Sequence, residues 1–498
     1  MQERSRLRLL LASFGDPGHA FPLIALGCAL RGRGHDVTVQ TAERWQADVE
    51  REGLGFVALP EYPVFPSGEQ RLSPYAASVR AALETAPLLE WLKPDAVVAD
   101  ILTVAPALAA EQAGVPWATL IPHLHPVAAA GLPPFSSGAR LPRTGAGRVL
   151  WRALAGVSGQ GVELGRRQLN AARAELGLAP LDYGHGGISR GLCLIATFPQ
   201  LEYPRAWAPS EHVVGPLLWE PSVPEVSGVH DGRPLVVVAP STSQDGEQRL
   251  VRAALAGLAG LPLRVLAVAG RESGLKGAGN ATLVDWISYA EAMPGAAVVV
   301  CHGGHGTVAR ALSCGVPLVV CPAAGDMFEN AARVDWAGVG VRVPRRLVGA
   351  RAVRLAVLRV LGDVGMRERA VGFATWAGEH DGARAGGGAG RGVCASAAVK
   401  KSSGGGTRTH NLSINSRAHL PVELPRITTL SYPGEGRSPD RLTVPLSTSA
   451  WQLEHRSTHL LASARARSIE RANPSALSSK LLTAGSTWWK CNAPGQRS

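Results

Sequence analysis

The sequence lacks the features that mark membrane-spanning, disulfide-rich and zinc-binding proteins. No apolar run reaches the roughly 18 residues that a transmembrane helix needs, because the richest stretch, AVVADILTVAPALAA, contains Asp100 and a proline. The seven cysteines occur singly, with no CxxC pair and no regular spacing. This pattern favours reduced thiols over a disulfide or zinc framework. We therefore expect a cytoplasmic protein without membrane insertion.

We also expect no cleavable signal peptide at the start of the sequence. The first residues, MQERSRLRLLLASF, have only a short apolar part, which leads into GDPGH without a small-residue cleavage site. We interpret this stretch as a first β-strand.

The net charge of +12 is concentrated near the end of the chain. The last hundred residues hold 14 Lys and Arg against 5 Asp and Glu, so the remainder is close to neutral. The basic character therefore belongs to the tail and says little about the folded part, and we expect no nucleic-acid partner.

Apolar strand runs alternate with helical stretches in two separate parts of the chain. Runs such as LRLLLASF, DVTVQT and AVVAD fill residues 7–122, and LVVVAPS, LRVLAVAG and AAVVVCHGG open the same pattern again. This alternation predicts parallel sheets covered by helices. A proline-rich segment, PLLWEPSVPEVSGVHDGRP, lies between them. The sequence thus predicts one α/β domain at 1–215, a linker at 216–233 and a second α/β domain at 234–385.

The character of the chain changes after about residue 385. The stretch GARAGGGAGRGVCASAAVKKSSGGG is rich in Gly and Ser, and the remainder is polar and without periodicity. We expect residues 386–498 to be disordered. Two explanations are open. The segment is an ordinary low-complexity tail, or a frameshift near residue 385 makes the reading frame run into a tRNA gene, because GGGTRTHN resembles the translation of such a gene on the wrong strand.

A glycine-rich turn, CHGGHGTVAR at 301–310, follows the apolar run AAVVV. A strand that ends in such a turn and starts a helix exposes backbone N–H groups at the positive end of the helix dipole, a geometry that binds phosphate. A tight turn that needs glycine for steric reasons alone gives the same pattern. The residues by themselves leave both interpretations open.

The longer segment VDWISYAEAMPGAAVVVCHGGHGTVARALSCGVPLVVCPAAGDMFENAARVDWAGVG resembles the nucleotide-sugar signature of GT-B glycosyltransferases that decorate natural products. It shares with them a tryptophan before the loop, HGG-x-GT, GVP, an aspartate and NAARV. The resemblance covers roughly residues 5–385. It implies two Rossmann-like, doubly wound domains that face a cleft, and hexosyl transfer from a nucleotide diphosphate sugar to a small hydrophobic acceptor. The nucleotide sugar is then a substrate, and no cofactor is expected.

The resemblance also implies roles for individual residues of the donor site. Trp286 stacks on the base, and the backbone of Ile287 reads its edge. Asp326 and Glu329 hold the hydroxyls of the sugar, although Asp326 is also suited to cap the following helix. The residues implied for the diphosphate are Ser241, Thr242, His302, Gly304, Gly306 and Thr307.

Two departures from the plant pattern bear on the nucleotide. The plant W-x-P-Q is Trp286-Ile287-Ser288-Tyr289 here, and the plant glutamate that holds the ribose falls at Arg310. HGGHGTVARAL resembles the actinobacterial branch more closely, which often uses thymidine-diphosphate deoxysugars. Uridine and thymidine diphosphate sugars both stay open as donors.

The first strand is followed by GHAFP, which is similar to the GHxxP of the same family, where the histidine is the general base. The acceptor hydroxyl must lose a proton, and the imidazole of His19 is suited to take it. Asp100 ends another apolar strand in the same domain. A carboxylate there would stabilise the imidazolium, so we expect His19 and Asp100 to form a catalytic pair.

We expect transfer without a metal ion, because no two aspartates stand in a D-x-D spacing. The glycine turn would hold the leaving diphosphate, and attack from the opposite face would invert the anomeric carbon. The acceptor pocket is expected from residues 60–90 and 123–185. Its candidate aromatic and imidazole side chains are Phe65, Tyr75, Trp91, His123, His125, Phe135 and Trp151.

Alternatives from other classes stay open. The chain fits a lipid or sterol glycosyltransferase or an epimerase less well, because no apolar or basic face and no extra acidic cluster stand out. A catalytically inactive or unstable relative is the second alternative. In this fold a last helix packs back on the N-terminal domain, and the glycine-rich stretch after residue 385 cannot supply it.

Overall fold

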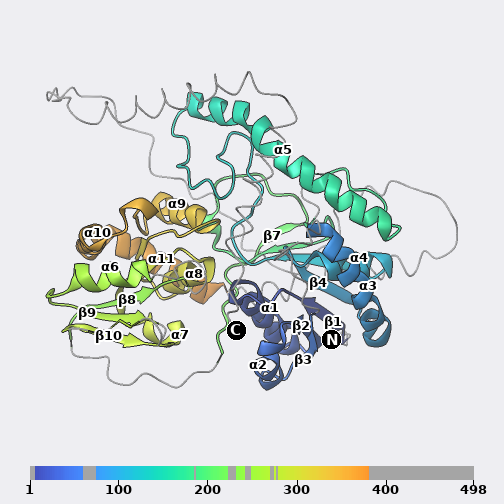
Figure 1. Ribbon diagram of the computed structural model, residues 1–498, viewed down its shortest axis with the longest axis horizontal. Helices are drawn as coiled ribbons and strands as arrows, with labels where there is room; N and C mark the ends of the chain where they lie inside the picture. The colour runs from blue at the N-terminus through green and yellow to red at the C-terminus, as the bar shows by residue number, and fades with distance from the viewer. Residues whose placement is uncertain are drawn as a thin grey trace. The chain divides into compact units, whose positions relative to one another are not determined.

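The computed structural model describes residues 6–59, 74–183, 187–221, 232–241, 248–269, 274–275, 277 and 279–380. Within them the chain forms two parallel β-sheets with helices packed on them (Figure 1). The predicted α/β architecture of two Rossmann-like, doubly wound domains is confirmed. The predicted tail at 386–498 and residues 222–231 of the predicted linker lie outside the described residues. No described helix has the length and apolar character that crossing a bilayer requires.

The first sheet has seven parallel strands in the order β3-β2-β1-β4-β5-β6-β7. The strands are β1 (Arg8–Ala12), β2 (Asp36–Thr41), β3 (Gly55–Ala58), β4 (Ala96–Asp100), β5 (Trp117–Ile121), β6 (Cys193–Ile195) and β7 (Glu211–Val213). The α-helices of this half are α1 (Pro17–Arg31), α2 (Gln46–Arg51), α3 (Pro74–Leu92), α4 (Val104–Gln112) and α5 (Gly145–Glu175).

The second sheet has six parallel strands in the order β10-β9-β8-β11-β12-β13. The strands are β8 (Leu235–Ala239), β9 (Arg264–Val268), β10 (Ala281–Val284), β11 (Ala296–Cys301), β12 (Leu318–Val320) and β13 (Gly340–Arg342). The α-helices are α6 (Arg249–Leu258), α7 (Tyr289–Ala292), α8 (His305–Ser313), α9 (Met327–Ala337), α10 (Ala350–Gly362) and α11 (Val364–Glu379).

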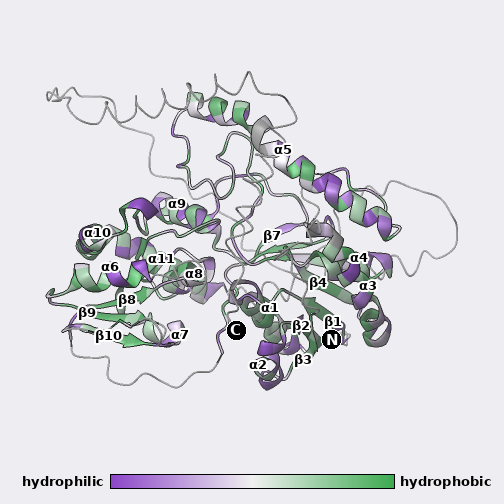
Figure 2. Cartoon of the chain, viewed as in Figure 1, coloured by the Kyte–Doolittle hydropathy of each residue, from purple (hydrophilic) through white to green (hydrophobic). Residues whose placement is uncertain are grey.

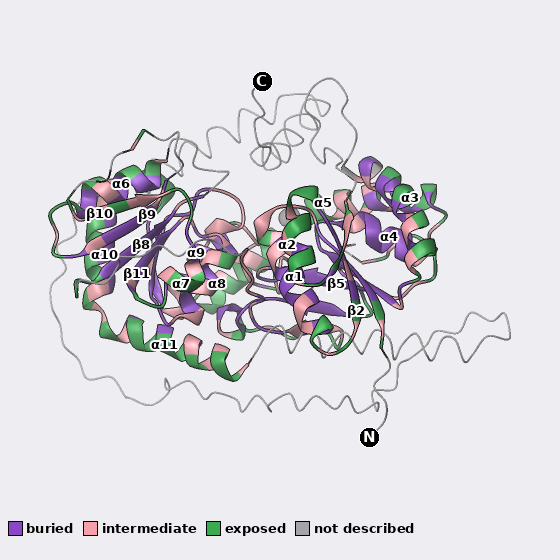
Figure 3. Cartoon of the chain, turned by 90° about the horizontal axis from the view of Figure 1, so that it is seen from below, coloured by how far each residue is buried: buried purple, intermediate pink, exposed green. Residues whose placement is uncertain are grey.

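The central strands are continuous apolar runs, because a parallel sheet is covered by helices on both faces. Every residue of β4 and of β8 is buried. Figure 2 shows the strands of both sheets mainly in hydrophobic colours, and Figure 3 shows them buried while the helices carry the exposed faces. The apolar runs thus become the middle layer of each domain.

Each sheet reverses its strand order at one place, and this places the candidate site. The reversal lies between β1 and β4 in the first sheet and between β8 and β11 in the second. Ligands of open α/β sheets bind outside the carboxyl ends of the strands at such points. The loops that follow these four strands are therefore where a ligand is expected.

Side chains from both halves of the chain share one apolar core. Phe198, which follows β6, is fully buried and belongs to the same cluster as the interior of the second sheet. Its ring lies edge-on to Phe373 and Trp376 of α11, with centroids 5.0 and 5.6 Å apart. The helix α11, which ends at Glu379, thus packs against a residue that follows a strand of the first sheet.

Candidate active site

A histidine and an aspartate meet where the first sheet reverses its order. The loop after β1 leads into α1, whose N-cap Asp16 accepts a hydrogen bond from the Gly18 backbone N–H at 2.8 Å, with Pro17 in the first turn. These capping preferences fix the start of the helix and place His19 in its first turn. Asp100, the last residue of β4, is buried, and its Oδ2 lies 2.8 Å from Nδ1 of His19.

The aspartate is itself held in place. Its other oxygen, Oδ1, accepts from the backbone N–H of Leu102 at 2.9 Å and from the Thr103 hydroxyl at 3.4 Å. Since these bonds occupy Oδ1, Oδ2 faces the imidazole. The proton between the two groups lies on Nδ1 of His19, so Nε2 is the nitrogen that a substrate can meet.

The electrostatics of this pair favour a charged imidazolium. Burial lowers the pKa of His19, but the Asp100 carboxylate and its hydrogen bond, with weaker contributions from Asp16 and Asp326, raise the pKa from 6.5 to about 9. A charged partner within hydrogen-bond reach commonly has this effect. The pair can therefore accept and stabilise a proton.

Aromatic rings flank His19. The Phe14 ring lies 5.3 Å from the imidazole, and the His123 ring lies 6.1 Å away, edge-on, with distances taken between centroids. His123 in turn stacks on Phe135 at 5.8 Å. These rings come from the loops after β1 and β5, so they form a wall beside the nitrogen that would take the proton.

The glycine turn at the end of β11 is built as the sequence suggests. Gly303 has φ +88°, and a Cβ there would press on the Val320 side chain and the Met327 carbonyl. Gly304 is the N-cap of α8, and no side chain caps this helix. The first backbone N–H groups of α8 therefore lack a carbonyl partner within the helix and stand at the positive end of its dipole.

The remaining residues of the turn differ in how much space surrounds them. A Cβ on Gly304 would collide with the His302 ring, whereas a Cβ on Gly306 would meet nothing within 4 Å. The His302 Nδ1 lies 3.2 Å from the Ala239 carbonyl oxygen at the end of β8. Gly306 and Thr307 lie in the first turn of α8. The turn thus presents an open helix N-terminus where the second sheet reverses its order.

Asp326 interacts electrostatically with both the His19–Asp100 pair and the histidines of the glycine turn. It stands at the N-cap of α9, yet its side chain makes no capping bond. Burial raises the pKa of its carboxyl, while the neighbouring imidazoles of His19, His305 and His302 lower it. The carboxylate is therefore placed among the histidines of both loops instead of closing its own helix.

Glu329 is committed to an ion pair. It is 2% exposed, and its Oε1 accepts from Nε of Arg333 at 2.8 Å. Arg333 also donates to the Leu201 carbonyl at 2.9 Å and lies 3.4 Å from the Glu202 carboxylate. Burial raises the pKa of both carboxyls, against the effect of Arg333.

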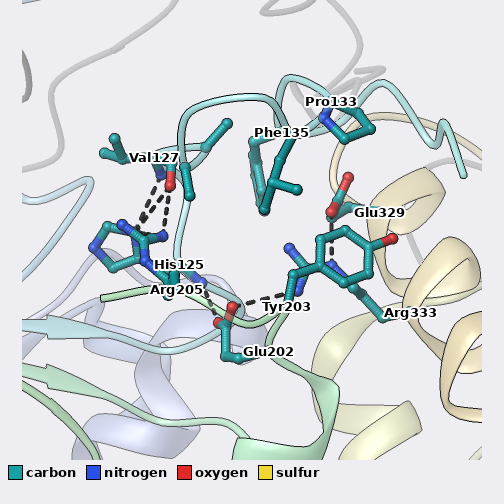
Figure 4. Close-up of a pocket in the computed structure, with 12 residues that line it drawn as sticks. His125, Val127, Pro133, Phe135, Glu202, Tyr203, Arg205, Glu329 and Arg333 are labelled. Atoms are coloured by element: carbon teal, nitrogen blue, oxygen red, sulfur yellow. Dashed lines mark hydrogen bonds and ion pairs between the residues drawn. The ribbon is translucent and has the colours of Figure 1, made fainter. Parts of the chain in front are cut away.

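These charged side chains line one small pocket (Figure 4). Phe135 and Pro133 close it from the loop after β5, and the Tyr203 ring lies 3.4 Å from the Arg333 guanidinium carbon. Besides Arg333, the backbone of Ser136 donates to the Glu329 carboxylate and lowers its pKa. Oε2 of Glu329 is the oxygen that does not bond to Arg333.

The tryptophan that is expected to stack on the nucleotide base lies in the turn after β10. Trp286 is 47% exposed and Ile287 is buried. The Ser288 hydroxyl caps α7, accepting from the Glu291 N–H at 3.3 Å, and donates to Oε2 of Glu220 at 3.1 Å. An exposed indole held on a capped turn is suited to stack on a flat ring.

Glu220 contacts residues of the predicted donor site, and the sequence did not indicate it. Its Oε1 pairs with Nε of Arg310 at 3.1 Å, and its Oε2 also accepts from the Ala290 N–H at 3.2 Å. Arg310 lies one turn along α8 from Gly306. The segment after β7 thus supplies a carboxylate beside the position where the plant enzymes carry one.

The other predicted residues divide into three groups. Ser241 is buried two residues after β8, next to the glycine turn's strand. Thr242 and Phe65 lie outside the described residues. Tyr75 packs among α3 and α4, Trp91 is 74% exposed on α3, Trp151 lies on α5, and His125 lies 3.2 Å from Glu211.

Two family models match the chain. Residues 9–119 match the N-terminal domain of glycosyltransferase family 28, and residues 266–377 match the C-terminal domain of erythromycin biosynthesis protein CIII-like proteins. The first match contains His19 and Asp100, and the second contains the glycine turn and Asp326.

Curated relatives are similar over nearly their whole length. The O-mycaminosyltylonolide 6-deoxyallosyltransferase of Streptomyces fradiae is 30% identical over 398 residues, which are 73% of this chain and 92% of the relative. The 4'-demethylrebeccamycin synthase of Lentzea aerocolonigenes is 28% identical over 395 residues, 73% of this chain and 94% of the relative.

Solved structures share the fold. The glycosyltransferase of kitacinnamycin superposes with a TM-score of 0.61 at 20% identity, over 80% of this chain and 98% of its own. The glycosyltransferase VinC, solved in complex with dTDP, superposes with a TM-score of 0.58 at 18% identity, over 78% of this chain and 100% of its own. The two-domain arrangement of GT-B proteins is therefore confirmed for this chain.

Proposed function

The chain belongs to the glycosyltransferases of antibiotic biosynthesis, and on that basis we propose that it moves a sugar from a nucleoside diphosphate sugar to a hydroxyl group of a small hydrophobic acceptor. The observation that carries this proposal is the His19–Asp100 pair at 2.8 Å. It stands at the switch point of one sheet, while an uncapped helix N-terminus stands at that of the other.

His19 acts as the general base. The acceptor O–H bond breaks as its proton passes to Nε2 of His19, and Nδ1 stays on the Asp100 carboxylate. The acceptor oxygen forms the new bond to the anomeric carbon. The bond from that carbon to the diphosphate oxygen breaks, and its electron pair leaves with the diphosphate. Attack opposite the leaving group inverts the anomeric centre.

The leaving diphosphate is stabilised at the start of α8. Backbone N–H groups from Gly304 to Thr307 and the helix dipole favour the negative charge that develops there. Among the described residues, no cluster of three or more His, Cys, Asp or Glu side chains is placed to hold a metal ion. We propose that these N–H groups carry out the charge stabilisation and that transfer needs no metal.

Thymidine diphosphate is the first nucleotide to test. The neighbour VinC is solved with dTDP, and the uridine pattern of plant enzymes is replaced here at Ser288, Tyr289 and Arg310. Trp286 supplies the exposed indole for the base. Asp326 is proposed to accept hydrogen bonds from the hydroxyls of the sugar, and Oε2 of Glu329 is the second acceptor.

The acceptor is proposed to lie against the ring wall of Phe14, His123 and Phe135. These rings flank His19, so a flat or macrocyclic apolar molecule placed on them would bring a hydroxyl to Nε2. Apolar walls with a few polar groups are typical of sites for small molecules.

The test is transfer by the purified full chain. Thymidine- and uridine-diphosphate sugars are incubated with hydroxylated macrolide and aromatic acceptors, and release of nucleoside diphosphate is measured together with the mass gain of the acceptor. We expect transfer with at least one pair. His19→Ala should abolish it without changing the Kd for thymidine diphosphate, and His212→Ala on β7 should leave both unchanged. A folded protein that neither binds nor cleaves any of these donors would overturn the proposal.

A further inference from the structure

His305, the first residue of α8, joins the two sheets through both ring nitrogens. Its Nδ1 lies 3.2 Å from the amide oxygen Oδ1 of Asn330 on α9. Its Nε2 lies 3.3 Å from the backbone carbonyl of Ala196, directly after β6 of the first sheet. The ring is buried, so water does not replace either contact.

Both neighbours of the ring are acceptors. The amide nitrogen of Asn330 donates to the Gly303 carbonyl at 2.8 Å, which turns the amide oxygen toward His305. A backbone carbonyl has no proton to give. A neutral imidazole carries one N–H, so it can satisfy one of these oxygens and must oppose a lone pair to the other. Only the imidazolium donates to both.

Without a ligand the ring is neutral. Burial lowers the pKa of His305 to about 4, with a smaller lowering by His123, while Asn330, Asp326 and Ala196 act in the opposite direction. The titratable groups that bear on the ring are thus Asp326 before α9 and His123 after β5. The contact between the sheets at this residue is then only half satisfied.

A diphosphate at the start of α8 changes this balance. If the nucleotide binds as proposed above, on which this inference rests, its negative charges lie against the backbone of His305 itself. Opposite charges within a few ångströms favour the charged form of an imidazole. We propose that His305 takes up a proton when the donor binds and then donates to both Asn330 and Ala196. Binding of the donor is thereby coupled to the contact with the first sheet, and His305 is a positioning residue.

The experiment is calorimetry of thymidine diphosphate binding to the full chain at pH 8. At this pH the terminal phosphate, whose pKa is about 6, is ionised before and after binding. The titration is repeated in HEPES and in Tris, which differ in ionisation enthalpy, so that the difference in heat gives the protons taken up. We expect uptake on the order of half a proton or more, and an affinity that weakens up to tenfold per pH unit between pH 7 and 8.5.

Two variants separate this residue from its neighbours. His305→Gln keeps one donor but cannot be charged, and it should lose most of the uptake, whereas His212→Gln on β7 should keep it. Normal binding without net uptake in the wild type would overturn the inference. Equal uptake in His305→Gln would also overturn it and would assign the uptake to another histidine of the site, His19, His302 or His123. No binding at all by the folded wild type would instead contradict the proposed donor site.

Discussion

The substitution Asp100→Asn tests the catalytic pair while keeping its shape. Asparagine retains the size of the side chain and an oxygen for the Leu102 N–H, but it removes the charge 2.8 Å from Nδ1 of His19. The amide also lets the ring take the other tautomer, in which Nε2 carries the proton and cannot accept one. Both effects act on the base and leave the donor site untouched.

The structure sets the size of the expected effect. Burial lowers the pKa of His19, but the charge and hydrogen bond of Asp100, together with Asp16 and Asp326, outweigh it and raise the pKa from 6.5 to about 9. A shift of that size corresponds to about 3 kcal/mol between the two protonation states. Without the carboxylate, burial is the largest remaining influence, so the pKa of His19 falls. The comparable substitution in a serine protease triad lowers the rate about 10⁴-fold, so we expect a loss on the order of 10³-fold or more.

The assay is kcat/KM against pH from 6 to 10. In the wild type the base must be deprotonated, so kcat/KM should rise with a midpoint near pH 9, the pKa of His19, toward a plateau at higher pH. In Asp100→Asn the midpoint should move down and the plateau should fall. Asp95→Asn, at the opposite end of the same strand, is the matched control and should keep the wild-type profile. An unchanged midpoint in Asp100→Asn, or a loss no larger than in the control, would refute the role of the pair.

Three further predictions use other parts of the structure. Gly306→Ala should raise the thermal midpoint of unfolding slightly, because nothing lies within 4 Å of the added methyl group and alanine favours a helix by up to about 1 kcal/mol. The same substitution should weaken thymidine diphosphate binding at least tenfold, whereas the control Gly372→Ala on α11 should not. Equal affinity in Gly306→Ala and wild type would show that the phosphate does not bind at this turn. Trp286→Ala should cost about 1–3 kcal/mol of nucleotide binding by calorimetry with little change in stability, since the indole is 47% exposed, and an unchanged Kd would exclude stacking. The pair of His19 and Asp100 should stabilise the fold fully below pH 6.5 and lose this effect as pH rises through about 9, because the pKa of His19 is higher in the folded state than in the unfolded state. The free energy of unfolding in urea should therefore differ most between wild type and Asp100→Asn at low pH. A difference that grows with pH would contradict the assignment.

The strands and the catalytic pair could be predicted because they depend on local patterns. A continuous apolar run predicts a buried parallel strand, and residues directly after such runs must lie at the carboxyl edge of the sheet. These runs placed the glycine turn and Asp100 at strand ends, whereas the roles expected of His19 and Asp100 came from the resemblance of GHAFP and the later signature to the glycosyltransferase family. The short strand β7 (Glu211–Val213) was missed because EHV has no apolar run.

The contacts that escaped prediction join segments far apart in sequence. Glu220 meets Arg310 across 90 residues, and Arg333 meets Glu202 across 131. Glu220 stands in a proline-rich stretch without periodicity, so no pattern marks it. Only the arrangement of the two sheets brings these charges together, and it also shows that His305 faces two acceptors.

The most direct test of the central claim is a crystal structure of the full chain with thymidine diphosphate. We predict that oxygens of the terminal phosphate accept hydrogen bonds at about 3 Å from backbone N–H groups between Gly304 and Thr307. Nε2 of His19 should face the space beside that phosphate. A nucleotide bound elsewhere, or a His19 ring turned away from the phosphate, would contradict the account.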